Sequence, residues 1–169
     1  WSASGPRSMR NPATLSAIES YLGSGLINRL HRRFVKTQRF SRESGLVIGE
    51  TGTRLITLTS GVVWYGAQDI VLSAFQSGDI DCDLNLWYHT AGVWTFEPVT
   101  QYSNMYYDDG TNRQTLSNNR YAVNWLYREV TDGRKHICIV LGGGDYDLAE
   151  AWDSPVPSIP APMQSTGVL

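Results

Sequence analysis

The sequence predicts a mainly β fold, an antiparallel sandwich or barrel-like domain preceded by a short helical segment. Short runs rich in aromatic and β-branched residues follow one another closely between Leu46 and Leu141, and Gly, Asp and Asn turn signals separate them. Many short strands at such spacing are typical of all-β sandwiches and barrels. The expected strands are Leu46–Glu50, Arg54–Thr59, Val62–Tyr65, Ile70–Phe75, Leu84–His89, Val93–Phe96, Gln101–Tyr107, Arg120–Glu129 and Lys135–Leu141.

The last two runs form the clearest local element, a β-hairpin. Residues alternate with a period of two from Arg120 to Glu129, and Thr131-Asp132-Gly133 then leads into an apolar run. Asp-Gly between apolar runs is a strong hairpin signal. One face of the first strand is expected to be buried, and it carries Tyr121, Val123, Trp125 and Tyr127.

The segments on either side of this region have different patterns. Asn11-Pro12 can start a helix, a second helical spacing runs from Leu26 to Phe34, and Phe34 to Phe40 also alternates like a strand. We therefore expect a helix followed by a strand in this part of the chain.

Beyond residue 141, Gly142-Gly143-Gly144 predicts a tight turn, and Asp145 can cap a helix from Tyr146 to Trp152. Four prolines in Ser154–Pro162 predict an extended spacer. The expected divisions are thus a linker and basic helical segment at 1–45, a β-rich domain at 46–153 and a Pro-rich spacer at 154–169. Because the chain begins with Trp1 and ends in an apolar run, we expect it to be a piece of a longer polypeptide.

Composition narrows the functional classes. A formal charge of -2 argues against a globally basic nucleic-acid binder and against an acidic disordered protein. A charged fraction of 18% is low for a soluble domain, and together with many Trp and Tyr it suggests surface buried against another chain. Cys82 and Cys138 are expected to be half-buried thiols, with a disulfide as the alternative. The sequence contains no long apolar run that predicts a membrane span and no secretory signal pattern.

Positive charge is concentrated in one short segment around His31, the basic patch, which comprises Arg29, Arg32, Arg33, Lys36, Arg39 and Arg42. Such a patch can bind the phosphates of nucleic acid or lipopolysaccharide. The alternatives are a solvated helix face and an interface with acidic neighbours.

Two further patterns resemble ligand sites only superficially. Asp79, Asp81 and Asp83 share a strand face, as Ca²⁺ ligands can, but lack the EF-hand spacing and are interpreted as an acidic loop. The glycine run at 142–144 lacks the Lys-Ser/Thr that closes a phosphate-binding loop. No cofactor or metal is expected.

No catalytic motif is evident around His31, His89 or His136, and Gly-x-Ser-x-Gly is missing from the sequence. A paired-carboxylate glycosidase site remains an alternative, because such pairs are assembled only by the fold. We therefore expect a protein that is not an enzyme.

Aromatic side chains are the stronger lead. Adjacent strand residues such as Trp87 and Tyr88 point to opposite faces, so many rings are expected to face away from the core. Outward rings mark sugar-stacking platforms or subunit interfaces, unless the protein itself covers both faces. The candidate binding residues are Trp64, Trp87, Tyr88, Trp94, Tyr106 and Tyr107.

Several motifs together resemble a module of bacteriophage tail-fibre and related virion appendage proteins, over roughly Leu46 to Leu169. They are Tyr106-Tyr107-Asp108-Asp109-Gly110, Asn119-Arg120-Tyr121-Ala122-Val123-Asn124-Trp125-Leu126-Tyr127, Val140-Leu141-Gly142, Tyr146-Asp147-Leu148-Ala149-Glu150-Ala151 and Ser154-Pro155-Val156-Pro157.

The resemblance implies a β-rich, intertwined homotrimer within a viral tail fibre, located in the virion and working in assembly and host-surface attachment. Its partners would be other virion proteins and a host surface glycan, and nucleic acid is not an expected partner. The alternatives are a tailspike-type polysaccharide depolymerase fragment and a purely structural connector.

Overall fold

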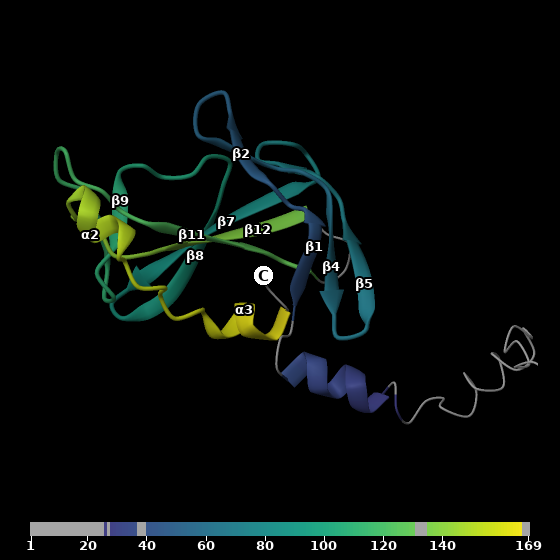
Figure 1. Cartoon of the computed structure of the whole chain (residues 1–169). Coiled ribbons are helices and arrows are strands. Elements are labelled where there is room, and N and C mark those ends of the chain that lie inside the picture. The colour runs from purple at the N-terminus through teal and green to yellow at the C-terminus, as the bar shows by residue number, and fades with distance from the viewer. Residues whose placement is uncertain (1–25, 27, 37–39, 131–134, 167–169) are drawn as a thin grey trace, which may run out of the picture. The chain divides into compact units, whose positions relative to one another are not determined.

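The computed structural model describes residues 26, 28–36, 40–130 and 135–166 and is mainly β, as the sequence predicts. Residues 28–36 are helical. The strands and remaining helices (Figure 1) are β1 (Ser41–Gly45), β2 (Ile48–Thr51), β3 (Leu55–Leu58), β4 (Gly61–Tyr65), β5 (Gln68–Leu72), β6 (Phe75–Gln76), β7 (Cys82–Thr90), β8 (Val93–Val99), β9 (Tyr106–Asp108), β10 (Arg113–Thr115), β11 (Asn124–Arg128), β12 (Lys135–Leu141), α2 (Leu148–Trp152) and α3 (Ala161–Thr166).

The described residues divide into two compact units, one within 1–41 and 64–69 and the other within 42–63 and 70–169. The strand orders are β1-β4-β5, β2-β3-β6, β10-β9 and β11-β12-β7-β8. In the first unit, the Tyr65 ring lies 5.4 Å from His31 and 5.2 Å from Phe40, centroid to centroid. Both buried hydrophobic clusters of the described residues lie in the second unit.

The sheet β11-β12-β7-β8 carries the core of this unit. The expected hairpin is present, because β11 pairs antiparallel with β12, Trp125 lying opposite Val140. β12 pairs with β7 in parallel, Ile139 lying opposite Leu86. A parallel pair needs a long crossover, and here the chain between β7 and β12 includes β8 to β11. The sequence did not predict this pairing.

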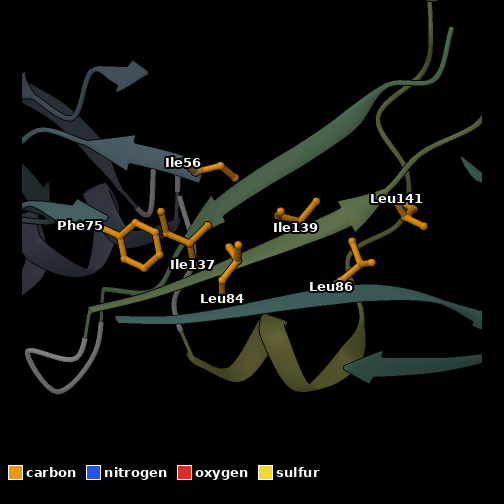
Figure 2. Packing of buried hydrophobic residues seen from close by; sticks show 7 residues of the cluster. All are labelled: Ile56, Phe75, Leu84, Leu86, Ile137, Ile139 and Leu141. Carbon is orange, nitrogen blue, oxygen red and sulfur yellow. The ribbon is translucent and has the colours of Figure 1, made fainter. Parts of the chain in front are cut away.

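One face of this sheet packs against the sheet β2-β3-β6. Figure 2 shows the side chains of the cluster, which are Ile56, Phe75, Leu84, Leu86, Ile137, Ile139 and Leu141. All are at most 4% exposed. Alternation along β7 and β12 directs these side chains to one side of the sheet.

The opposite face is also covered. Trp87, Tyr127, Cys138 and Val140 form a second buried cluster with Met163 from α3. This explains why Trp87 and Tyr88, although adjacent, are both engaged by protein. Rings on the outward-facing side of the sheet are therefore not automatically free for a ligand.

The buried face expected for β11 is only partly buried. Tyr127 is 9% exposed, but Tyr121 lies outside the strand and is 47% exposed. The reason is that Tyr121 forms an isolated bridge to Tyr146 rather than continuing β11. Trp125 is half-buried against the second cluster.

The C-terminal predictions need two corrections. Asp147, and not Asp145, caps α2, and its carboxylate and that of Glu150 form a capping box. Asp145 has a φ of 61° and instead accepts hydrogen bonds from Ser117. The expected extended spacer through Pro162 ends earlier, since α3 begins at Ala161.

Two further differences concern short elements. β10 was not predicted, and only the end of the expected strand Gln101–Tyr107 is part of a strand, β9. The expected strand-like pattern from Phe34 is helical up to residue 36. The expected helix start at Asn11-Pro12 lies outside the described residues.

Candidate carbohydrate-binding groove

A groove of about 620 Å³ opens on the face of the core sheet that carries Leu84, Leu86 and the rest of the buried cluster in Figure 2. Leu86 of β7 lies opposite Glu97 of β8, and Leu84 opposite Val99, so all four side chains share this face. We call this the β7–β8 groove. Its lining comprises Arg54, Cys82, Asp83, Leu84, Asn85, Leu86, Glu97, Pro98, Val99, Thr100, Gln101, Tyr102, Ser103, Met105, Tyr106 and Arg113.

Arg113 contacts two aromatic rings and a carboxylate at the edge of the groove. Its guanidinium carbon lies 4.4 Å from the ring centroid of Tyr88 and 4.8 Å from that of Tyr106. Its Nη1 donates to the Glu97 carboxylate at 2.5 Å. Cation–π contacts on two rings and an ion pair fix the guanidinium in one plane. Two of the predicted aromatic residues, Tyr88 and Tyr106, are thus brought together around a cation.

Arg113 reaches this place because a tight hairpin joins β9 to β10, Arg113 lying opposite Asp108. The Asp109 carboxylate closes the turn, accepting from the amides of Thr111 and Asn112 at 2.8 and 2.7 Å. The other carboxylate oxygen of Asp109 accepts from the Gln114 side chain at 2.7 Å. The hydrogen bond from the Asn112 amide, and then that from Gln114, lower the pKa of Asp109. The ionised Asp109 carboxylate therefore stabilises the turn that carries Arg113 into the groove.

Arg54 enters the groove from the three-residue loop between β2 and β3. Its Nη2 donates to Gln101 Oε1 at 3.0 Å and its Nη1 to Asn104 Oδ1 at 3.3 Å. Its carbonyl accepts from the Tyr102 amide at 3.1 Å. Three hydrogen bonds therefore tie this loop to the segment that forms another wall of the groove.

Tyr102 presents a neutral hydroxyl beside Arg54. The hydroxyl donates to Glu50 Oε1 at 3.2 Å, and the same oxygen accepts the Arg54 amide at 3.0 Å. Removal from water, and then the hydrogen bond and charge of Glu50, raise the pKa of Tyr102. Tyr102 therefore remains a hydrogen-bond donor and a ring surface at physiological pH.

Rigid rings beside planar polar groups are the chemistry that sugars require. The aliphatic faces of a pyranose pack on aromatic rings, while its hydroxyls exchange hydrogen bonds with amide, carboxylate and guanidinium groups. The groove combines Tyr102 and Tyr106 with Gln101, Glu97 and two arginines. The groove therefore offers ring faces, amide groups, a carboxylate and guanidinium groups side by side.

The carboxylates in the lining are poorly arranged for hydrolysis. Glycosidases place an acid and a base or nucleophile on either side of the bond that is cleaved. Of the two carboxylates in the lining, Glu97 is engaged in an ion pair with Arg113, and Asp83 alternates with Leu84 along β7, so its side chain leaves the strand on the side opposite to that of Leu84 and Glu97.

A Cys–His–Glu arrangement lies outside the groove. His136 Nδ1 contacts the Glu129 carboxylate, and its Nε2 lies 3.6 Å from Cys138 Sγ. Cys138 is only 3% exposed, and burial, the largest cause, raises the pKa of its thiol to about 11. The thiol is therefore protonated at neutral pH and shielded from substrates, which is the opposite of an activated nucleophile.

His89 is part of a second buried pair. The carboxylate of Asp108 accepts from the His89 amide at 2.8 Å and contacts its Nδ1 at 2.9 Å, while its other oxygen accepts from the Gly110 amide at 2.8 Å. The imidazole stacks on Trp94 at 3.7 Å. This pair joins the end of β7 to the β9–β10 turn.

The remaining predicted aromatic residues are dispersed. Trp87 is 7% exposed and stacks on Phe96, so it is not a surface platform. Tyr107 packs closely on Gly144, where a Cβ would lie 2.3 Å from the Cβ of Tyr107. Trp64 is 39% exposed and belongs to the first unit.

The basic patch is divided between the two units. Arg29, Arg32, Arg33 and Lys36 are exposed on the helix at 28–36, whereas Arg42 is exposed on β1 in the second unit. Arg39 lies outside the described residues. Nothing in this placement adds to the sequence-based prediction for the patch.

The sequence did not indicate Arg54, Arg113, Glu97 or Gln101 as groove residues. The only local signal was the turn at Asp108-Asp109-Gly110, which predicts a hairpin but not what the hairpin carries. Within the described part of the chain, no three His, Cys, Asp or Glu side chains gather to hold a metal ion. None of the described helices is long and apolar enough to cross a membrane.

Comparison with known proteins gives no relatives: the chain matches no family model, and searches of curated proteins and of solved structures find no match.

Proposed function

We propose that this chain is a module of a viral tail fibre or similar virion appendage, and that it attaches to a glycan of the host surface through the β7–β8 groove without cleaving it. The observation that supports glycan binding is the Arg113 side chain held between Tyr88 and Tyr106 at the edge of a polar groove. The viral role depends on the sequence resemblance alone.

A homotrimer is part of the proposal. An open groove that contacts one or two sugars binds weakly, and three copies on one fibre gain avidity without any new contact. Exposed apolar side chains such as Trp152, 83% exposed, and Leu148, 55% exposed, are compatible with burial against other chains.

Binding is best measured with the intact protein on host envelope fractions and extracted polysaccharide. Tyr106→Leu keeps an apolar side chain on the groove wall but removes the aromatic ring, so we expect binding to be lost. Tyr121→Leu is the matched control, because Tyr121 is an exposed tyrosine that does not line the groove. Sedimentation of the intact protein should report three chains.

Three results would contradict the proposal. Equal binding by the two tyrosine variants would place the glycan elsewhere. Failure of the protein to bind any envelope fraction to which virions bind would favour the connector. Release of shortened oligosaccharides, abolished by Glu97→Gln, would favour the depolymerase.

A further inference from the structure

The two arginines in the β7–β8 groove differ in their charge partners. Arg113 is paired with the Glu97 carboxylate. The guanidinium of Arg54 donates to the neutral amide oxygens of Gln101 and Asn104, and no carboxylate among the described residues forms an ion pair with it. A guanidinium has five N–H groups, so Arg54 keeps donors for a further acceptor.

The nearest acidic side chain is already engaged with other groups. Oε1 of Glu50 accepts from the Arg54 backbone amide and from the Tyr102 hydroxyl. It therefore holds the loop and orients the tyrosine, and it forms no ion pair with the Arg54 guanidinium.

Arg54 is therefore a cation of the groove without an ion-pair partner. Arg113 is paired with Glu97, whereas neither Asp83, which also lines the groove, nor any other carboxylate of the described residues forms an ion pair with Arg54. Partly desolvated charge in a groove attracts an oppositely charged group more strongly than charge on an open surface.

Arg54 also has a backbone conformation that is uncommon for a residue with a side chain. Thr51 pairs with Leu55, so the loop comprises Gly52, Thr53 and Arg54. Arg54 has a φ of 59°, at the loop position where glycine is the favoured residue. Residues in this conformation persist where the surrounding contacts hold them, and at Arg54 the hydrogen bonds of its amide and its guanidinium supply such contacts.

We infer that the groove selects glycans that carry a carboxylate, such as uronic or sialic acid residues, and that Arg54 is the residue that recognises this group. This inference rests on the proposed glycan-binding function. The planar guanidinium matches the two oxygens of a carboxylate, whereas an ammonium group does not. Tyr102 and Tyr106 would bind the sugar ring beside the carboxylate.

The test uses the intact protein and two defined probes, a galacturonic acid oligosaccharide and the same oligosaccharide after reduction of its carboxyl groups. Titration followed by NMR suits the weak affinity expected. We expect the acidic probe to bind at least tenfold more tightly than the reduced probe, with a preference that declines as salt increases.

Three variants assign this preference to Arg54. Arg54→Gln should abolish the preference, so that the acidic probe binds no more tightly than the reduced probe. Arg54→Gly should also abolish the preference, and its thermal unfolding midpoint shows whether relief of the positive φ offsets the loss of the hydrogen bonds to Gln101 and Asn104. Arg42→Gln, which removes an exposed arginine outside the groove, should change neither affinity.

Equal affinity of the wild-type protein for both probes would overturn the inference and leave the proposed function standing. Loss of both affinities in Arg54→Gln, with an unchanged unfolding midpoint, would also overturn it, because Arg54 would then serve the sugar ring rather than the carboxylate. Binding of neither probe nor of any host envelope fraction would overturn the inference and the proposed function together.

Discussion

Replacing Arg113 with alanine removes the central contact of the groove. Its guanidinium lies 4.4 and 4.8 Å from the Tyr88 and Tyr106 rings, and each such contact contributes about 0.5–1 kcal/mol at a partly exposed site. The ion pair with Glu97 contributes less than about 1 kcal/mol, because the Arg113 and Glu97 side chains remain 31% and 40% exposed. We expect Arg113→Ala to lower the free energy of unfolding by about 1–3 kcal/mol.

Urea unfolding of the wild-type protein and the variant at one protein concentration measures this difference. Arg113→Lys should lose less than the alanine variant, since it keeps the charge but not the planar surface. A double-mutant cycle with Glu97→Gln isolates the ion pair. A change in the free energy of unfolding of less than about 0.5 kcal/mol in Arg113→Ala would contradict the expected role of this side chain. So would an effect of Arg113→Ala that is unchanged after both tyrosines are replaced with leucine.

Three other perturbations probe the core, the thiols and the turn. Ile139→Ala, at a side chain that is 0% exposed, should lower the free energy of unfolding by about 2–5 kcal/mol in urea titrations, and a loss below about 1 kcal/mol would mean that the site is less tightly packed. At pH 8 a thiol reagent should label Cys82 and spare Cys138, whose pKa is about 11, and mass spectrometry of native Cys82→Ser should show no label; labelled Cys138 would contradict its burial. Asp109 has a folded-state pKa below the ordinary 3.8, so its stabilisation of the turn is complete above pH 3.8 and is lost as the pH falls through the folded pKa. The acid-unfolding curve of Asp109→Asn should lack this component, and a curve identical to that of the wild-type protein would refute the assignment.

The short strands and one of the hairpins could be predicted because the signals are local. Alternation with a period of two and the Asp-Gly turn before Lys135 lie within a few residues of the strands that they specify. β10 escaped prediction because Arg113, Gln114 and Thr115 carry no apolar alternation. Its strand conformation depends on pairing with β9 and on the Asp109 turn.

The N-cap of α2 also could not be predicted from the local sequence. Asp145 and Asp147 are both suitable caps by residue type, and the cap predicted from the sequence is Asp145. The structure uses Asp147, because Asp145 is engaged by Ser117, a residue distant in the sequence. A contact that closes only when the chain folds decided between two locally equivalent residues.

The sequence by itself determined the mainly β class, the positions of most strands and an unusual wealth of aromatic side chains, since backbone propensity and side-chain alternation act over a few residues. Only the tertiary structure decided that β7 and β12 pair in parallel and that both faces of their sheet are covered, so that Trp87 became core. It also brought Arg54 and Arg113 to one groove. The physical reason is that strand pairing and burial depend on contacts between segments that are distant in the sequence, and a local sequence pattern does not specify these contacts.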